Sequence, residues 1–389
     1  MYQFDAERAQ SKNTMVHLLY FCVILLLGTG LVTLYSASYF FADRFFGDGH
    51  YFFKKQVIFG AAGLAAFFIF SRINLDILRK FILPFVIIAG VLCVLTIIPG
   101  IGVERYGASR WIEIGSMSYQ PSEMVKFVLP LYLAHLIDKK SDNLSGFNSG
   151  ILKSFLVTIV FFFLIYMQNN FSTAVFIILN AMIIFFLAGM RYRYFIAAAA
   201  MIIPVSALLV FTREHRVKRL VSFLRPEWDP MGAGFQVNAS RDAIISSGFF
   251  GKGIGEGTRK LASIPEIHSD FIFSAYVEET GFIGILLFLV MFAAFAVLGY
   301  IAALRSQSVF GRILAAGLTT MIILQMLLNI AVVSGALPAT GIPLPFFSAG
   351  GSSLLTTLIC AGLITNVARR GSASNKEKVF NDLENENEY

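Results

Sequence analysis

Ionisable residues gather at the start of one apolar segment, in the stretch IPEIHSDFIF that begins at position 264. Asp270 comes directly before the apolar run that starts at Phe271, and His268 lies two residues earlier. A carboxylate at the edge of hydrocarbon is partly desolvated, which raises its pKa and improves it as a proton acceptor near neutral pH. Asp270 suits the N-cap of a helix equally well. His268 could shuttle a proton, orient a carboxylate or simply occupy a surface loop.

Three further ionisable residues lie inside apolar stretches, and they are Glu278, Glu279 and Lys126. Charged groups at membrane depth are costly, so they usually face a cavity or a partner of opposite charge. We therefore expect the two glutamates to pair with Lys126 or with an arginine. Lys126 in turn needs a carboxylate or an anionic ligand. Such pairs can be purely structural, so position alone assigns Glu279 no catalytic role.

A basic and aromatic pair precedes a predicted helix start in the stretch RWIEIGSMSYQPSEMVKF, which begins at position 110. Trp111 suits the membrane interface, and Arg110 can bind a phosphate through two parallel hydrogen bonds. Pro121 and Ser122 suit the first turn of a helix. Lys126 then follows about one turn after Ser122 and faces the helix bundle.

Two stretches rich in glycine or proline interrupt the apolar pattern. The stretch GKGIGEGTRK, at 251–260, has backbone amides and terminal cations that could hold a phosphate. A flexible loop explains the same composition. The stretch LPATGIPLPFFSAGGSS, at 337–353, places irregular backbone at membrane depth. Such backbone must line a cavity or pack against protein.

The composition is that of an integral membrane protein. Of the 389 residues, 57% are hydrophobic and 14% are charged, whereas soluble domains carry about 25% charged residues. The apolar runs are long enough to cross about 30 Å of hydrocarbon as helices, and the alternating pattern of a β-barrel is absent. The net charge of +7 does not indicate nucleic acid, because the basic residues flank the apolar runs. The three cysteines lie inside apolar runs and indicate neither a disulfide framework nor a metal site.

We predict an all-α, polytopic membrane protein with about ten transmembrane helices. The predicted spans are 15–36, 55–71, 80–98, 121–137, 153–168, 172–190, 194–211, 271–301, 310–334 and 349–368. A large extracytoplasmic loop, 212–270, separates the seventh span from the eighth. The transmembrane domain covers 15–370 and follows a cytoplasmic segment at 1–14. The cytoplasmic tail at 371–389 is polar and mixed in charge, which predicts disorder.

Lysine and arginine predict a cytoplasmic location for both chain ends. In the short loops, these residues concentrate on the side of the termini, as the positive-inside rule requires. No cleavable signal peptide is predicted, because the first apolar run is too long for its hydrophobic region. The loops at 99–120, 212–270 and 335–348 then face outward. We therefore expect substrate chemistry at the outer boundary between membrane and water.

Five strings in this sequence resemble the SEDS family, which comprises the FtsW, RodA and SpoVE proteins. They are ASRWIEIG followed by QPSEMVK, FLRPEWDPMGAGFQ, GKGIGEGTRKL, IPEIHSDFIF, and LPATGIPLPFFSAGGSS. They occur in the family's order and extend across 15–370. The resemblance implies ten transmembrane helices with a large outer loop between the seventh and the eighth. The residues of the last two strings resemble those of FtsW more than those of RodA.

The resemblance implies a peptidoglycan glycosyltransferase of the cytoplasmic membrane, active in cell division. Such a protein polymerises lipid II and works with a class B penicillin-binding protein. Its further partners would be other divisome or elongasome membrane proteins and membrane lipid. Asp270 would act as general base on the acceptor hydroxyl, with undecaprenyl pyrophosphate as the leaving group. Arg110, Lys126 or cations of 213–219 and 252–260 would offset the charge of the pyrophosphate.

The family's functional residues fall on residues singled out above. Its essential aspartate falls on Asp270, and its RW pair falls on Arg110 and Trp111. The lysine of its QPSExxK motif falls on Lys126. The resemblance leaves open a divalent cation, Mg²⁺ or Mn²⁺, and implies no other cofactor. Further substrate-binding candidates, as orienting or metal-binding groups, are Glu266, His268 and Glu279.

The sequence departs from the family pattern in three places, of which the mildest is His268-Ser269-Asp270 where the family has HTD. The family's QPDxGTA reads QNNFSTA here, so Asn170 replaces the acid and any charge role at that position is lost. Gly257 stands where a serine is frequent, so we assign it no binding role. The alternative functions are a lipid II flippase, an elongation polymerase of the RodA type, and a scaffold that recruits a penicillin-binding protein.

Overall fold

The computed structural model describes residues 2–105, 108–115, 117–139, 149–225, 233–257 and 267–386. Within these ranges most of the chain is helical. The helices are α1 (Tyr2–Phe46), α2 (Tyr51–Phe70), α3 (Leu75–Lys80), α4 (Ile82–Leu95), α5 (Pro121–Asp138), α6 (Ser149–Met167), α7 (Phe171–Leu187), α8 (Tyr192–Phe211), α9 (Glu214–Leu224), α10 (Ala233–Ser246), α12 (Ile272–Arg305), α13 (Val309–Val333) and α14 (Gly351–Glu386). The strands are β1 (Gly102–Arg105), β2 (Ala108–Ile114) and β3 (Met117–Tyr119).

Each predicted span coincides with a helix, in the order α1, α2, α4, α5, α6, α7, α8, α12, α13 and α14. In the described part of the chain, six helices are long and apolar enough to cross a membrane: α1, α2, α8, α12, α13 and α14. Helices α4, α6 and α7 are apolar but shorter, and α5 carries Glu123 and Lys126. The chain is therefore a multi-pass membrane protein. The number of helices that cross the membrane stays a prediction.

Local sequence signals set several helix ends. Helix α5 begins at Pro121. Proline lacks a backbone N–H, and this costs no hydrogen bond at the first position of a helix, because the N–H groups there have no partner within the helix. Helix α13 follows Ser308, whose side chain accepts a hydrogen bond from the backbone N–H of Gly311. Helix α3 follows Asn74, whose side chain accepts one from Asp76. These signals account for where α3, α5 and α13 begin.

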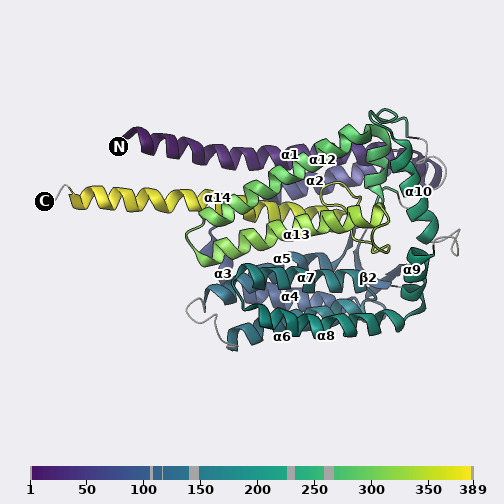
Figure 1. Ribbon diagram of the computed structural model, residues 1–389, viewed down its shortest axis with the longest axis horizontal. Helices are drawn as coiled ribbons and strands as arrows, with labels where there is room; N and C mark the ends of the chain where they lie inside the picture. The colour runs from purple at the N-terminus through teal and green to yellow at the C-terminus, as the bar shows by residue number, and fades with distance from the viewer. Residues whose placement is uncertain are drawn as a thin grey trace.

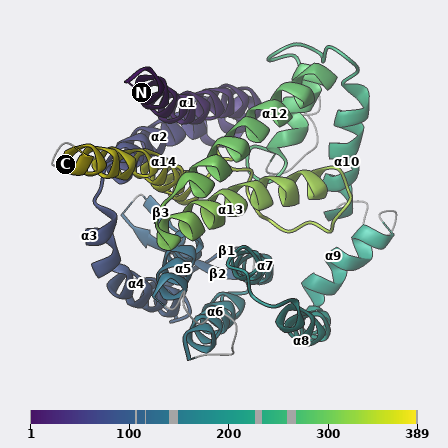
Figure 2. The same cartoon turned by 60° about the vertical axis from the view of Figure 1, so that its left-hand side comes forward.

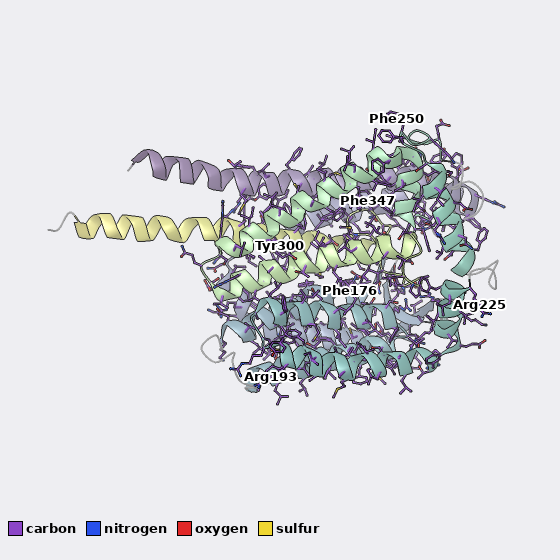
Figure 3. All side chains as sticks on the ribbon, viewed as in Figure 1. Phe176, Arg193, Arg225, Phe250, Tyr300 and Phe347 are labelled. Atoms are coloured by element: carbon purple, nitrogen blue, oxygen red, sulfur yellow. The ribbon has the colours of Figure 1, made fainter. Side chains whose placement is uncertain are left out.

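The helices form two groups that meet along α13 and also between α5 and α14 (Figures 1 and 2). Helices α1, α2, α12 and α14 form one group, in which α12 and α14 contact α13. Helices α4, α5, α6 and α7 form the other, in which α5 and α7 contact α13. Figure 3 shows Phe347 in the first group and Phe176 in the second, and both side chains are fully buried. Helix α8 lies at the rim of the second group, and none of its residues is buried.

The two chain ends lie at one end of the bundle, whereas β2, α9 and α10 lie at the other (Figure 1). We call the latter the sheet end. Figure 3 places Arg193 toward the chain ends and Arg225 at the sheet end. This arrangement agrees with the predicted location of both termini on the same side. Which side is cytoplasmic stays a prediction.

A small sheet adds to the predicted all-α fold. The segment before α5 forms three antiparallel strands in the order β1-β2-β3. Trp111 pairs with Val103, and Ile112 pairs with Tyr119. Gly115, at a φ of 62°, lies where β2 turns into β3 and tolerates this backbone because it has no Cβ. The strands are too short to stand out as an alternating pattern in the sequence.

Both terminal helices are longer than predicted. Helix α14 continues through Glu386, so the segment after Gly371 is helical where its composition predicts disorder. Helix α1 begins at Tyr2, within the predicted N-terminal segment. Extending an existing helix needs no new nucleus, and the lysines and glutamates of the tail favour the helix. Between α8 and α12, the described parts of the large loop contain α9 and α10.

Candidate active site

Asp270 lies at the sheet end, directly before α12, and is half-buried. The cap position of α12 is Phe271, and no described side chain caps this helix, so Asp270 does not serve as its N-cap. The loop before α14 passes beside the carboxylate. A Cβ added to Gly341 would lie 3.4 Å from Oδ2 of Asp270. The carboxylate thus has a wall on one side and remains partly accessible.

Arg110 reaches the same place from β2. The pKa of Arg110 is lowered to about 10, with burial as the largest cause. The charges of Arg219 and Arg216 contribute to this lowering, and the charge of Asp270 opposes it. The Nη2 of Arg110 donates to the backbone carbonyl of Asn169 at 2.5 Å. At neutral pH this guanidinium is still protonated, so three arginines and Asp270 share one electrostatic field.

Arg216 is a buried cation at the start of α9, and its side chain is 7% exposed. Its guanidinium stacks over the rings of Tyr166, at 4.6 Å, and Phe171, at 5.1 Å. Its Nη1 donates to the carbonyl of Leu209 at 2.9 Å. The Nε atoms of Arg110 and Arg216 are buried and have no hydrogen-bond partner among the described residues. Both side chains therefore keep donors suited to an anionic group.

Trp111 follows Arg110 in β2 and pairs with Val103 of β1. The register between β1 and β2 shifts here, because Trp111 pairs with Val103 and Ser109 pairs with Glu104, which leaves Arg110 as the extra residue of a β-bulge. A bulge interrupts the regular alternation of side chains between the two faces of a sheet. A substrate contact of Trp111 stays a prediction.

Lys126 is buried in the core of α5, away from the predicted glutamates. Its Nζ lies 2.7 Å from Oε1 of Glu123 and 3.3 Å from Oε1 of Gln325 on α13. Lys126 and Glu123 are three residues apart, which makes them neighbours on a helix, so this pair was readable from the sequence. The predicted ion pair of Lys126 with Glu278 or Glu279 is wrong. The predicted contact of Lys126 with substrate stays a prediction.

Glu278 and Glu279 have partners from other elements. The Nζ of Lys252 lies 2.6 Å from Oε1 of Glu278, whose side chain is 1% exposed. The Oγ of Ser36 donates to Oε1 of Glu279 at 2.5 Å. The glutamates therefore join α12 to the loop after α10 and to α1. This arrangement favours the structural interpretation of the two residues, and a role of Glu279 in binding substrate or metal stays a prediction.

A kink in α12 brings Lys252 to this position. The kink is at Gly281, with φ 68° and ψ −160°, a conformation open essentially to glycine alone. Backbone groups released by the kink bond to residues 248–253, which we call the strap. The four bonds are Lys252 N to Glu278 O, Gly253 N to Glu279 O, Phe282 N to Gly248 O and Ile283 N to Phe249 O, with lengths of 3.0, 3.0, 3.1 and 3.2 Å. Residues 251–253, the first part of the glycine-rich stretch that could have held phosphate, thus belong to this strap, and the backbone amides of Lys252 and Gly253 donate to α12.

His268 is buried, which excludes the surface-loop interpretation. Its side chain is 7% exposed, and its ring centroid lies 5.0 Å from that of Phe41 and 4.1 Å from that of Phe52. Its backbone carbonyl accepts a hydrogen bond from Ala349 N at 2.9 Å. Burial lowers the pKa of His268 to about 4. The imidazole is therefore neutral at pH 7, and it is poorly suited to donate a proton there.

The burial of His268 predicts a loss of stability in acid. Its pKa is about 4 in the folded protein and about 6.5 in an unfolded chain, so the unfolded state binds more protons between these values. The stability that neutral His268 provides is present above about pH 6.5 and is lost as the pH falls toward 4, by about 3 kcal/mol in total. His268→Phe keeps a ring between the two phenylalanines and should flatten the pH dependence of the melting temperature in this window. His17→Phe, at an exposed histidine, should leave that dependence unchanged.

A divalent cation stays a prediction. Within the described ranges, no cluster of three or more His, Cys, Asp or Glu side chains has the arrangement to hold a metal ion. His268 Nδ1 is buried without a hydrogen-bond partner there, but its ring lies between Phe41 and Phe52. Glu266, the remaining candidate, lies outside the described residues.

The fold and the site together define a polytopic helical membrane protein with a carboxylate and an arginine cluster at one end of the bundle. Residues 16–373 match the family model of FtsW, RodA and SpoVE, described as a cell cycle protein. The chain belongs to this family. The resemblance inferred from the five strings is thereby confirmed.

Relatives and solved structures cover nearly the whole chain. A probable peptidoglycan glycosyltransferase FtsW from Trichlorobacter lovleyi is 38% identical over 346 residues, which are 89% of this chain and 91% of that protein. Stage V sporulation protein E of Bacillus subtilis is 36% identical over 360 residues, 92% and 98% of the two chains. A chain from a peptidoglycan synthase complex that coordinates polymerization and crosslinking superposes with a TM-score of 0.73, at 25% identity and 90% and 96% coverage. RodA of Thermus thermophilus, at 24% identity, shares the fold with a TM-score of 0.67 and coverage of 90% and 95%.

Proposed function

We propose that this chain is a peptidoglycan glycosyltransferase that polymerises lipid II at the outer face of the cytoplasmic membrane. Two facts support the enzyme class: the chain belongs to the FtsW, RodA and SpoVE family, and curated relatives are named as probable glycosyltransferases. The observation that carries the chemistry is the placement of a half-buried Asp270 in the field of Arg110, whose charge also interacts with Arg216 and Arg219. A base and a set of anion-binding groups are the two components that this reaction requires.

In the proposed reaction, Asp270 accepts the proton of the acceptor hydroxyl as that oxygen attacks C1 of the donor sugar. A new C–O bond forms, the bond between C1 and the pyrophosphate oxygen breaks, and undecaprenyl pyrophosphate leaves. Arg110 and Arg216 stabilise the negative charge that develops on the leaving pyrophosphate. A cation held by burial and ring stacking, as Arg216 is, needs little rearrangement when this charge appears.

The sheet end faces outward in this proposal, and both chain ends are cytoplasmic. The distribution of lysine and arginine in the short loops supports this orientation. The apolar surfaces of the bundle would accommodate the polyprenyl chain in the membrane. A substrate anchored in this way presents its pyrophosphate and sugars at the membrane boundary, where the basic cluster lies.

A class B penicillin-binding protein is the proposed partner, alongside other membrane proteins of the divisome. The structural neighbour from a peptidoglycan synthase complex supports such a partner. A role in cell division is supported by the relatives named FtsW. Localisation of a tagged copy tests the assignment, because midcell supports division and the side wall supports elongation.

The test of the function is glycan synthesis by the purified chain from labelled lipid II, with and without a class B penicillin-binding protein. Polymeric glycan and free undecaprenyl pyrophosphate are the expected products. A flippase would instead move labelled lipid II across reconstituted vesicles without extending any glycan. Movement without polymer, in the presence of the partner, would overturn the polymerase proposal.

Arg216→Gln should lower kcat/KM for lipid II about tenfold to a hundredfold, which corresponds to the loss of a charge-assisted contact of roughly 1.5–3 kcal/mol. Arg216→Lys should recover only part of the loss, because an ammonium cannot reproduce the planar fork of a guanidinium. Steady-state kinetics with lipid II measures both variants. Arg193→Gln, which removes an exposed arginine near the opposite end of the bundle, is the control and should leave kcat/KM unchanged.

A further inference from the structure

Two buried amides on α13 contact the loop that forms the wall beside Asp270. Gln325 and Asn329 are four residues apart and therefore lie on the same face of the helix. Their side chains are 2% and 1% exposed. The Nε2 of Gln325 donates to the backbone carbonyl of Pro343 at 2.8 Å. The Nδ2 of Asn329 donates to the carbonyl of Ile342 at 2.9 Å.

Asn329 also contacts the residue that carries the proposed base. Its Nδ2 donates to the backbone carbonyl of Asp270, again at 2.9 Å. The two N–H groups of one amide therefore join two segments, one before α12 and one before α14. The orientation of this amide is determined chemically, because a carbonyl acceptor requires a donor and the amide oxygen cannot replace it.

The loop held by Asn329 is the one that contacts the carboxylate. Gly341, next to Ile342, has a φ of 70°, and a Cβ added there would lie 3.4 Å from Oδ2 of Asp270. A shift of the loop or of the backbone at Asp270 would change the position of the carboxylate relative to this wall. Neither movement is compatible with both hydrogen bonds of Asn329. The amide therefore sets the relative placement of the base and the wall of its site.

We propose that Asn329 is a positioning residue, which holds the carboxylate of Asp270 at the distance from the Gly341 loop that the transfer reaction requires. This inference rests on the proposed glycosyltransferase function. Asn329 acts through the backbone of Asp270 and contacts no reacting atom. Its loss should therefore affect the chemical step more than the binding of substrate.

The same network extends to Lys126 on α5. Its Nζ lies 3.3 Å from Oε1 of Gln325, which leaves the Nε2 of Gln325 to donate to Pro343. The Nζ of Lys126 also lies 2.7 Å from Oε1 of Glu123. The chain of contacts thus runs from α5 through α13 to the loop before α14.

The sequence contains a signal that could have singled out these amides in advance. Gln325 and Asn329 occur in the string QMLLN, inside an apolar span. Two amides at a helical spacing in such a span must face a polar partner, since unsatisfied polar groups are costly in hydrocarbon. The partners themselves, which are backbone carbonyls from two distant segments, have no signature in the sequence.

The test compares two buried asparagines with the same chemistry. Asn366 of α14 is also 1% exposed and donates to the carbonyls of Phe70 and Ile73, at 2.7 and 2.8 Å. It lies fifteen residues along α14 from Gly351, about 22 Å toward the opposite end of the bundle. Asn366→Leu therefore reproduces the loss of two buried donor contacts away from Asp270, and it also removes the hydrogen bond that Oδ1 of Asn366 accepts from Nε of Arg370 at 3.2 Å.

For Asn329→Leu we expect kcat on lipid II to fall about a hundredfold, since small misplacements of a reacting group have effects of this size. KM should stay within about twofold, because no substrate contact is removed. Asn366→Leu should lower the melting temperature by a comparable amount and leave kcat nearly unchanged. If Asn329→Leu does not yield folded protein, Asn329→Asp keeps the volume of the side chain and replaces its donors, and the same fall in kcat is expected.

Three results would overturn the positioning role. The first is a folded Asn329 variant with unchanged kcat, and the second is an equal fall in kcat for Asn366→Leu. The third is a rise in KM without a fall in kcat. If the unmodified protein makes no glycan from lipid II, the proposed function fails first and the positioning role fails with it. Failure of the proposed function can be told apart from failure of the positioning role alone, because it is observed with the unmodified protein.

Discussion

Asp270→Asn should reduce glycan synthesis from lipid II by a factor of about 10² to 10⁴, the usual contribution of a general base. The amide has nearly the shape of the carboxylate but cannot accept the proton of the acceptor hydroxyl. The hydrogen bond from Asn329 should survive, because it uses the backbone carbonyl of Asp270. The fold should therefore be retained, and the loss should appear in kcat. The measurement is the initial rate of polymer formation by the purified variant with its penicillin-binding partner present.

Asp76→Asn is the matched control for this substitution. Asp76 is an exposed carboxylate on α3, and its side chain is 74% exposed. Its contact with Arg370, at 3.8 Å, is a surface ion pair of little energetic value. This control should polymerise lipid II at the rate of the unmodified protein. If Asp270→Asn also polymerises at nearly that rate, the base must be another group, and the mechanism proposed for Asp270 is wrong.

Gly281→Ala should destabilise the protein by at least about 3 kcal/mol, well above the effect of an average substitution. The backbone there has a φ of 68° and a ψ of −160°, which costs a residue with a side chain about 1–3 kcal/mol. A Cβ at Gly281 would also lie 2.2 Å from the backbone nitrogen of Gly251. The strap must then move away, and its hydrogen bonds to α12 are lost, each worth about 0.5–1.5 kcal/mol. The expected observation is a lower melting temperature in detergent and increased aggregation.

Gly251→Ala should have a similar effect from the other side of the contact. An added Cβ there would lie 2.2 Å from the backbone oxygen of Glu279, and Gly251 has a φ of 76°. Gly90→Ala on α4 is the control, because nothing lies within 4 Å of an added Cβ and alanine favours a helix over glycine. A melting temperature of Gly281→Ala equal to that of Gly90→Ala would show that the kink and the strap do not depend on each other.

Much of the fold follows from the composition of the apolar segments. In hydrocarbon, backbone polar groups must be satisfied within the segment, so long apolar runs become helices. For this reason the ten predicted spans coincide with ten helices of the structure. Asp270 could be singled out in the same way, because a carboxylate directly before an apolar run is readable from neighbouring residues. The ion pair of Glu123 and Lys126 was equally accessible, since its members are three residues apart on one helix.

What the sequence by itself determined about this protein is therefore its membrane class and its helical segments, whereas the role of Asp270 as the base stays a prediction. Only the tertiary structure decided that Lys252 pairs with Glu278, that aromatic rings enclose His268, and that one amide joins Asp270 to the loop before α14. The physical reason is the range of the contacts. A helix repeats every 3.6 residues and leaves a periodic pattern in the sequence, whereas a contact between distant segments depends on how the kink in α12 and the packing of α13 bring them together.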